Sequence, residues 1–288
     1  MKTMSRDKAE EREDKFDLPF KVWPPELVAR VENATHDIAL TELSLRHYRT
    51  VVKDTPEEGI REAQYEFRSR STIEWDVDPN NRLIVPNSTD LCLKSRRQLR
   101  VRSEHEVPSE GDFNNACASL NDHSEGLLYR IFNEAGICNP ELDIVDLAFG
   151  DVERHYRELS LPITPAGFRA TKPHQAFKTV VLSQCLDSVQ VIGRLDNGRM
   201  RVIGTLAQLE IENKNKVCPH EGTTQRITSV DASDVQIDGA MREASDIWND
   251  ALPRSIVART FASEMSKSGY IRNTTIDWMS GPRLSLVG

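Results

Sequence analysis

The sequence lacks any apolar run of about 18 residues, the length at which a membrane-spanning helix is expected. Residues 1–15 are charged throughout and have no apolar centre, so we expect no secretory signal. The five cysteines are scattered, odd in number and without a CxxC pair, which favours reduced thiols. These absences predict an intracellular protein, cytoplasmic or nuclear, that does not associate with a membrane.

Motifs that hold nucleotides, zinc or a nucleophilic serine are also missing. There is no GxxxxGK[ST] or GxGxxG loop, no HExxH helix and no GxSxG elbow. Cys218 and His220 form a Cys-Pro-His triplet without the second pair of ligands that a zinc site needs. The formal charge of −8 argues against a surface that coats nucleic acid everywhere, although it leaves room for a local basic groove.

The 288 residues are enough for one large domain or two small ones. Residues 1–18 are dense in charge and poor in apolar side chains, a composition typical of disorder. We therefore predict a disordered tail over 1–18. The rest of the chain has no internal repeat and no long linker, so we expect residues 19–288 to form a single elaborated domain.

The clearest local signal is the turn Asp196-Asn197-Gly198, because a tight hairpin turn needs residues that tolerate positive φ. Apolar and polar residues alternate on both sides of this turn, which is the period of a β-strand. The pattern predicts a bulge near Gly204. It also predicts three adjacent antiparallel strands, at 177–183, 188–195 and 199–214.

Helical spacing of apolar residues predicts an amphipathic helix over 239–252, with Ile247 and Trp248 packed against the sheet. A second helix is expected over 124–135, and Pro24-Pro25 can open another. Less regular patterns predict short helices at 38–48 and 57–67, and strands at 72–75, 82–85 and 90–102. These elements predict an α/β or α+β fold, with a mixed central sheet and an antiparallel meander flanked by helices.

The order helix, three strands, helix over residues 124–265 resembles the core of the PD-(D/E)XK nuclease-like superfamily. Glu212-Asn213-Lys214 matches the E-x-K element of that superfamily, and Asp187 stands where its first acidic residue could lie. A glutamine after a loop, here Gln225, is similar to fungal members. The resemblance implies a restriction-endonuclease-like core over about 120–265.

The resemblance also implies a metal site. Asp187 and Glu212 would hold Mg²⁺ or Mn²⁺, because hard cations prefer carboxylate oxygens. Lys214, two residues from Glu212 on a strand, would orient the attacking water or stabilise developing charge. Glu125 would add an acidic contact from the helix, and Gln225 would support Lys214 or touch phosphate. The alternatives are a solvated strand face for Glu212 and Lys214, and a helix cap for Glu125.

One basic cluster could position nucleic acid through its phosphates. It consists of Lys94, Arg96, Arg97, Arg100 and Arg102. The alternative is an edge strand that uses charge to resist aggregation. The residues and the resemblance together predict a metal-dependent nuclease, or a degenerate descendant of one, with nucleic acid as its partner. The other hypotheses are an inactive module of the same fold that binds nucleic acid or protein, and a scaffold without a site.

Overall fold

The computed structural model describes residues 10–75, 84–96, 101–109, 112–195, 197–213, 217–219, 233–257, 261–262 and 265–280. Within these residues, ten strands form one sheet in which every pairing is antiparallel. The strands are β1 (Glu10–Leu18), β2 (Ser44–Asp54), β3 (Tyr65–Trp75), β4 (Ile84–Ser95), β5 (Val101–Pro108), β6 (Val145–Ile163), β7 (Lys178–Arg194), β8 (Met200–Asn213), β9 (Val217–Pro219) and β10 (Phe261–Ala262).

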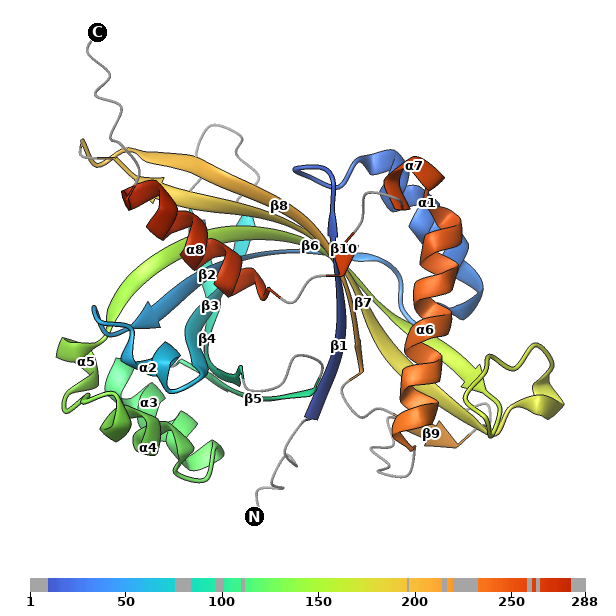
Figure 1. Ribbon diagram of the computed structural model, residues 1–288, viewed down its shortest axis with the longest axis horizontal. Coiled ribbons are helices and arrows are strands. Elements are labelled where there is room, and N and C mark those ends of the chain that lie inside the picture. Colours follow the sequence, from blue (N-terminus) through green and yellow to red (C-terminus); the bar gives the residue numbers. More distant parts are fainter. Residues whose placement is uncertain are drawn as a thin grey trace, which may run out of the picture.

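Eight of these strands close into a ring, which makes the sheet a barrel (Figure 1). Around the ring the order is β1, β5, β4, β3, β2, β6, β7, β8, and β8 pairs back onto β1. Strand β1 closes the ring by pairing on both sides: Glu10 to Arg12 face β5, and Arg12 to Leu18 face β8. Strands β9 and β10 lie outside the ring, paired with β7 and β1.

Helices cover the barrel at both ends and also enter it (Figure 1). At one end, α1 and α6 pack on the outer face, and at the other the short helices α2 to α5 gather beside β3 to β5. The helices are α1 (Pro25–Thr35), α2 (Gly59–Glu62), α3 (Phe113–His123), α4 (Leu127–Glu134), α5 (Pro140–Asp143), α6 (Asp234–Ala251), α7 (Arg254–Val257) and α8 (Lys267–Ser280), with single 3₁₀ turns at His36–Ile38 and Pro173–Gln175. No described helix is long and apolar enough to cross a bilayer.

Three apolar clusters hold these layers together. One joins α1 and α6 to β6, β7 and β8, and a second joins α3 and α4 to β3, β4 and β5. The third lies on the opposite face of β2, β6 and β7, where Ile271 of α8 is fully buried. Because parts of the sheet are covered on both faces, β7 is buried almost throughout its length.

Helix α8 approaches the sheet closely because glycines lie beneath it. A Cβ added at Gly150 of β6 would lie 2.6 Å from the Cδ1 atom of Ile271. A Cβ at Gly204 of β8 would lie 2.5 Å from the Cγ2 atom of Thr274. Both distances are shorter than van der Waals contact, so α8 can pack this close to the sheet only where these two positions lack side chains.

The predicted hairpin is confirmed at its turn and bulge. Gly198 has φ of 79°, and Leu195 and Arg199 are bonded across the turn. The register between β7 and β8 shifts beside Gly204, as predicted. The meander is wrong in one respect: the predicted strands 177–183 and 188–195 are a single strand, β7, because the pairing with β6 and β8 continues through residues 184–187, where Asp187 faces the inside of the barrel.

The charged tail is wrong for residues 10–18, which form β1. Its buried charges, Glu13 and Lys15, lie inside the barrel, so a composition typical of disorder here belongs to a strand. The helix predicted at 38–48 is wrong, because the 3₁₀ turn ends at Ile38 and β2 begins at Ser44. The helix predicted at 57–67 is confirmed only over Gly59–Glu62, as α2, and β3 begins at Tyr65.

The helix predicted at 239–252 is confirmed as α6, where Trp248 is 1% exposed and Ile247 is partly buried against the same cluster. The α+β class with a sheet flanked by helices is also confirmed. The mixed sheet and the restriction-endonuclease-like core over 120–265 are wrong, because every described pairing is antiparallel and strands β1 to β5, from outside that range, complete the ring.

Candidate active site inside the barrel

The inside of the barrel is lined by charged side chains. On β8, Leu209 and Ile211 pack outward against the helices, so Glu210 and Glu212 face inward. The same alternation and the ion pairs across neighbouring strands assign the other inner residues. The charged lining comprises Glu13, Lys15, Glu66, Arg68, Arg70, Lys94, Glu104, Arg154, Asp187, Glu210 and Glu212, together with Lys267 from α8.

Glu210 lies at the centre of one group of charges. Arg154 donates a hydrogen bond of 2.6 Å from Nη2 to its Oε2 atom, and Lys267 forms an ion pair with the same oxygen. The ammonium of Lys15 lies 3.4 Å from its Oε1 atom. Burial raises the pKa of Glu210, but Lys267, Lys15 and Arg154 together hold that pKa well below its ordinary value. Glu210 is therefore a carboxylate near neutral pH.

Asp187 is held by the same cations. Arg154 binds it in a bidentate pair of 2.7 and 2.8 Å, and the Nζ atom of Lys267 lies 2.8 Å from Oδ2. Asp187 is fully buried, so two fixed cations are needed to keep its charge inside the barrel. Burial lowers the pKa of Lys267, but Asp187 and Glu210 raise it above its ordinary value, so Lys267 is charged.

A second group of charges lies on β3, β4 and β5. Arg68 bonds Glu66 at 3.2 Å and Glu104 at 2.8 Å, and the Nζ atom of Lys94 lies 3.5 Å from Glu13 of β1. Burial raises the pKa of Glu66, but Arg68 and further donors lower it to about 2. Glu13 also pairs with Lys15, which contacts Glu210, so the two groups are connected through β1 and each contains charges of both signs.

The first residues of α8 connect the two groups. Ser266, just before the helix, donates a 2.6 Å hydrogen bond to Glu66, and Ser268 accepts one of 3.0 Å from Arg68. Lys267, between them, reaches Asp187 and Glu210. Three consecutive residues of one segment thus contact both charged groups.

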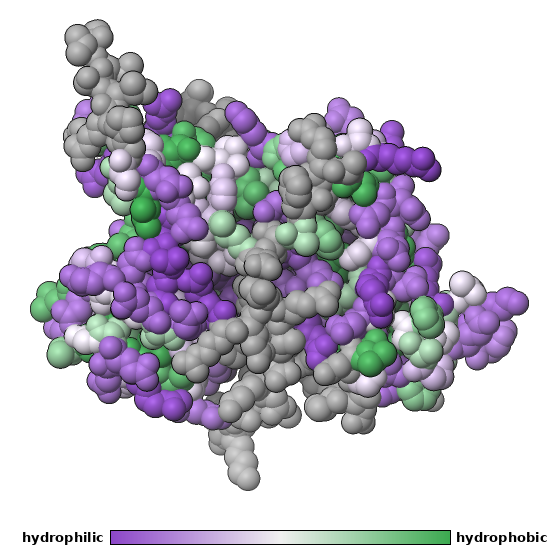
Figure 2. Space-filling model, viewed as in Figure 1, coloured by the Kyte–Doolittle hydropathy of each residue, from purple (hydrophilic) through white to green (hydrophobic). Residues whose placement is uncertain are grey.

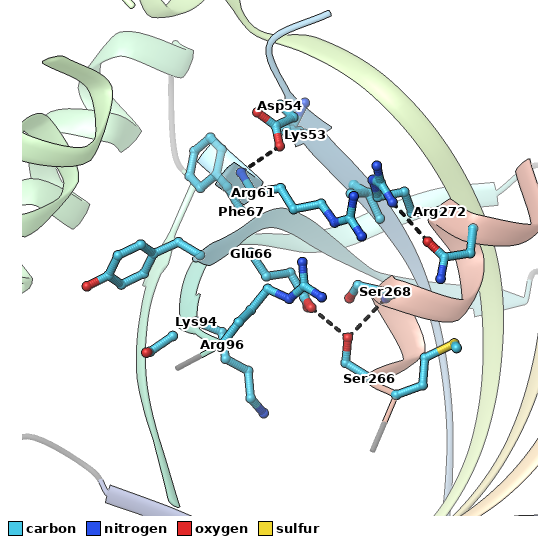
Figure 3. A pocket seen from close by; sticks show the side chains of 16 residues that line it. Lys53, Asp54, Arg61, Glu66, Phe67, Lys94, Arg96, Ser266, Ser268 and Arg272 are labelled. Atoms are coloured by element: carbon cyan, nitrogen blue, oxygen red, sulfur yellow. Dashed lines mark hydrogen bonds between the residues drawn. The ribbon is translucent and has the colours of Figure 1, made fainter. Parts of the chain in front are cut away.

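A cavity of about 260 Å³ lies beside this segment. Lys94, Arg61, Arg96 and Arg272 line it, and Glu66 and Ser266 meet at its inner side (Figure 3). Hydrophilic residues gather between α8 and α2 on the face shown in Figure 2. The cavity offers an anionic molecule a route towards the charged lining.

The residues at the acidic end of the lining can hold a divalent cation. Cys185, Glu210 and Glu212 each offer a ligand atom, and these atoms lie within 4.8 Å of one another. Glu13 stands directly opposite Glu212 in the pairing of β1 with β8. The Oε1 atom of Glu210 is buried and accepts no hydrogen bond from the residues that the structure describes; its partner among them is the ammonium of Lys15, at 3.4 Å. Two to three carboxylates fit a hard divalent cation.

The structure does not bring Asp187 and Glu212 together as the sequence suggested. Glu212 stands opposite Ser183, and Asp187 stands opposite Gln208, four residues further along β7. That offset corresponds to roughly 13 Å along a strand. Both oxygens of Asp187 are already bonded to Arg154 and Lys267. Glu210, rather than Asp187, shares the acidic group with Glu212.

The remaining predicted catalytic residues are not part of the lining that the structure describes. Lys214 and Gln225 lie outside the described residues. Glu125 is exposed in the turn between α3 and α4, with φ of 53°, and does not start the helix as predicted. The turn lies on the outer side of the barrel, where α3 and α4 cover the sheet.

The predicted basic cluster divides between different places. Lys94 is buried inside the barrel, whereas Arg96 is exposed at the end of β4 and lines the cavity. Arg97 and Arg100 lie outside the described residues, and Arg102 belongs to β5, with its side chain outside the description. The single strand predicted over 90–102 is wrong, because β4 ends at Ser95 and β5 begins at Val101.

Sequence reasoning missed most of the lining. The missed residues are Glu13, Lys15, Glu66, Arg68, Arg70, Glu104, Arg154 and Lys267. The available signal was charge at every second position, as in Glu13-Asp14-Lys15, Glu66-Phe67-Arg68 and Glu210-Ile211-Glu212. Such alternation suits strands that face an apolar layer on one side and a charged interior on the other.

No family model and no curated protein matches the chain. Among solved structures it is similar to HpAC1 from Hippeastrum, described as a proposed adenylyl cyclase with a dominant triphosphatase activity (18% identity, 92% of this chain and 95% of that chain, TM-score 0.47). It is also similar to the PH1819 protein from Pyrococcus horikoshii (11% identity, 91% and 98%, TM-score 0.44) and to the Mimivirus capping enzyme triphosphatase (9% identity, 85% and 92%, TM-score 0.34).

The resemblance to the PD-(D/E)XK nuclease-like superfamily is wrong. The strands close into an antiparallel barrel, and the similar solved structures include triphosphatases and adenylate cyclase-type proteins. The nuclease function and its inactive-module alternative rested on that resemblance and are withdrawn with it. Because all of these TM-scores lie below 0.5, we base the functional interpretation on the side chains inside the barrel.

Proposed function

We propose that the barrel interior binds a linear triphosphate group and hydrolyses one of its phosphoanhydride bonds with the help of a divalent cation. The observation that carries this proposal is the lining itself: a closed ring of eight strands encloses buried charges of both signs. Burying so many charges is costly, and such groups are retained where they serve a site.

The size of the barrel limits the ligand. An antiparallel barrel of eight strands has an interior just wide enough for side chains or for one small ligand. A nucleic-acid duplex does not fit in such a space, whereas an unbranched chain of phosphates is thin enough to enter between the side chains. The predicted nucleic-acid partner stays a prediction and is not part of this proposal.

The cations of the lining suit phosphate oxygens. Arg68 and Arg154 present planar guanidinium groups, which bind phosphate in bidentate fashion. In the structure these groups bind Glu104 and Asp187, so they are already oriented and desolvated. A phosphate that exchanges with a carboxylate at these positions keeps each cation paired. The ligand therefore does not have to pay the cost of burying the arginines.

The acidic residues complete the site. Glu210 and Glu212, with Glu13 opposite, would hold Mg²⁺ or Mn²⁺. A divalent cation there would neutralise phosphate charge and make a bound water more acidic. Arg154 and Lys267, beside Glu210, would stabilise the negative charge that develops on the phosphate oxygens.

The test is the release of inorganic phosphate from inorganic triphosphate and from ATP, with Mg²⁺ or Mn²⁺. We expect metal-dependent release by the wild type and loss of release in Glu212→Gln, because the substitution removes a ligand charge. Glu42→Gln is the matched control, since Glu42 is exposed ahead of β2. Absence of release from both substrates with both ions, or equal release by Glu212→Gln, would overturn the proposal.

A further inference from the structure

A buried thiol shares the barrel interior with the two glutamates of β8. Cys185 of β7 is fully buried and reduced, and it stands directly opposite Glu210 in the pairing of β7 with β8. Glu212 is the next inward residue along β8, so it lies diagonally across from the thiol. The sulfur and one oxygen from each glutamate lie within 4.8 Å of one another.

This donor set differs from an all-oxygen site in the metal that it prefers. Mg²⁺ and Ca²⁺ take oxygen ligands, whereas a thiolate selects softer ions such as Zn²⁺. One sulfur with two carboxylates gives three protein ligands and leaves a fourth position open. Three protein ligands with one open position is the composition of catalytic zinc sites. The chemistry of the group thus points to ions of the Zn²⁺ class.

A separate observation indicates that this group accepts a cation. Glu210 is about 99% buried, and within the described part of the chain its Oε1 atom accepts no hydrogen bond, although the ammonium of Lys15 lies 3.4 Å away. Its other oxygen is bonded to Arg154. A buried carboxylate oxygen without a hydrogen bond is costly, and a metal ligand bond would satisfy it.

We propose that Cys185, Glu210 and Glu212 form a site for a thiophilic divalent cation, with the sulfur bound as thiolate. Binding releases the thiol proton to solvent. Loss of the thiol proton offsets one of the two positive charges that the ion adds among Lys15, Arg154 and Lys267. The site shares Glu210 and Glu212 with the proposed triphosphate site, and it rests on the proposed function only through these two residues. Zn²⁺ and Mg²⁺ would therefore compete for the same ligands.

The experiment is a titration of the full-length protein with Co²⁺, the spectroscopic substitute for Zn²⁺, without any phosphate substrate. Cys138 and Cys218 are first replaced by serine, so that the exposed thiol of Cys138 and the thiol of Cys218 do not contribute. We expect a thiolate-to-cobalt charge-transfer band that Zn²⁺ abolishes by displacement. Cys185→Ser should lose the band and bind Zn²⁺ at least about tenfold more weakly, since even outer partners of a metal site contribute about 10- to 100-fold.

Cys92→Ser is the matched control. Cys92 is a second fully buried cysteine on the inner face, with its thiol 3.1 Å from Glu104, and it is not part of the metal-ligand group. This variant should keep the band. Bound Co²⁺ without the band, or equal Zn²⁺ affinity in Cys185→Ser, would overturn the inference. If Cys185→Ser fails to fold, Glu212→Gln serves as the second variant, with Cys185 retained and Cys138 and Cys218 still replaced by serine. It should keep the band at weakened Co²⁺ affinity, and unchanged affinity would also overturn the inference. Because no substrate is present, failure of triphosphate hydrolysis would leave these results unaffected.

Discussion

Replacing Lys267 by methionine should destabilise the protein by removing the cation that α8 inserts into the barrel. The ammonium pairs with Asp187 and Glu210, and all three side chains are at least about nine-tenths buried. Methionine has a similar length and no charge, so the change removes the ion pairs with little change in volume. Breaking a buried ion pair by removing one partner typically costs about 3–5 kcal/mol, because the remaining charge is left in the interior.

Arg154 lowers the loss of stability that we expect for Lys267→Met. It contacts both carboxylates, so neither would be left without a cation in Lys267→Met. We therefore expect the free energy of unfolding to fall by about 3 kcal/mol, the lower end of that range. Urea denaturation at pH 7 measures the change. Lys172→Met is the control, because Lys172 is exposed between β6 and β7, and it should alter stability by less than about 0.5 kcal/mol.

The deficit of Lys267→Met should depend on pH. The pKa of Glu210 in the folded protein lies well below its ordinary value: burial raises it, but Lys267, Lys15 and Arg154 lower it. A carboxyl group of this kind stabilises the fold above its unfolded pKa of about 4.3, and the contribution is lost as pH falls through the folded pKa. Without Lys267, the pKa of Glu210 in the folded protein is lowered less. The difference between variant and wild type should therefore be largest near pH 7 and shrink as the pH falls through the folded pKa of Glu210 in the variant.

A Lys267→Met protein as stable as the wild type at pH 7 would refute the reasoning. So would a deficit that stays constant from pH 7 down to the lowest pH at which the wild type is folded, because a loss of packing alone involves no titrating group. The double variant Lys267→Met with Asp187→Asn separates these cases. If the charges cause the deficit, neutralising Asp187 should recover part of the lost stability.

Two further predictions concern packing. Trp248→Ala should lower the free energy of unfolding, measured by urea denaturation, by about 3–5 kcal/mol, because Trp248 is buried and stacks on Phe16 of β1 at 5.4 Å between ring centres. A variant as stable as the parent would show that α6 does not stabilise the closure of the ring. Gly150→Ala should lower the free energy of unfolding by about 1–3 kcal/mol, because the added methyl group would collide with Ile271. The double variant with Ile271→Ala should lose less stability than the sum of the two single variants. Strict additivity would show that α8 lies further from β6.

The parts predicted correctly from sequence depend on neighbours along the chain. The hairpin after Leu195 follows from residues that tolerate positive φ, and Gly198 adopts it. Helix α6 follows from apolar spacing that one helix displays by itself, and Trp248 lies on its buried face. In both cases the signal and the structure occupy the same short segment.

The barrel could not be predicted in this way because its closure joins distant segments. Glu13 of β1 stands opposite Glu212 of β8, 199 positions later in the chain. Read alone, β1 has the composition of a disordered tail, since half of its residues face an interior that is charged instead of apolar. Lys267 carries no pattern of its own, and its role appears only when α8 is placed over the glycines of the sheet.

Binding of inorganic triphosphate, measured by titration calorimetry with Mg²⁺ present, tests the central claim most directly. The informative variant is Arg70→Met, because Arg70 faces the interior and its ion pair, 3.5 Å to Glu106, is long. A lost hydrogen bond to a charged group costs about 1.5–3 kcal/mol, so affinity should fall roughly 10- to 150-fold. Arg130→Met, on the exposed side of α4, should bind like the wild type. No binding by the wild type, or equal binding by both variants, would contradict a triphosphate site inside the barrel.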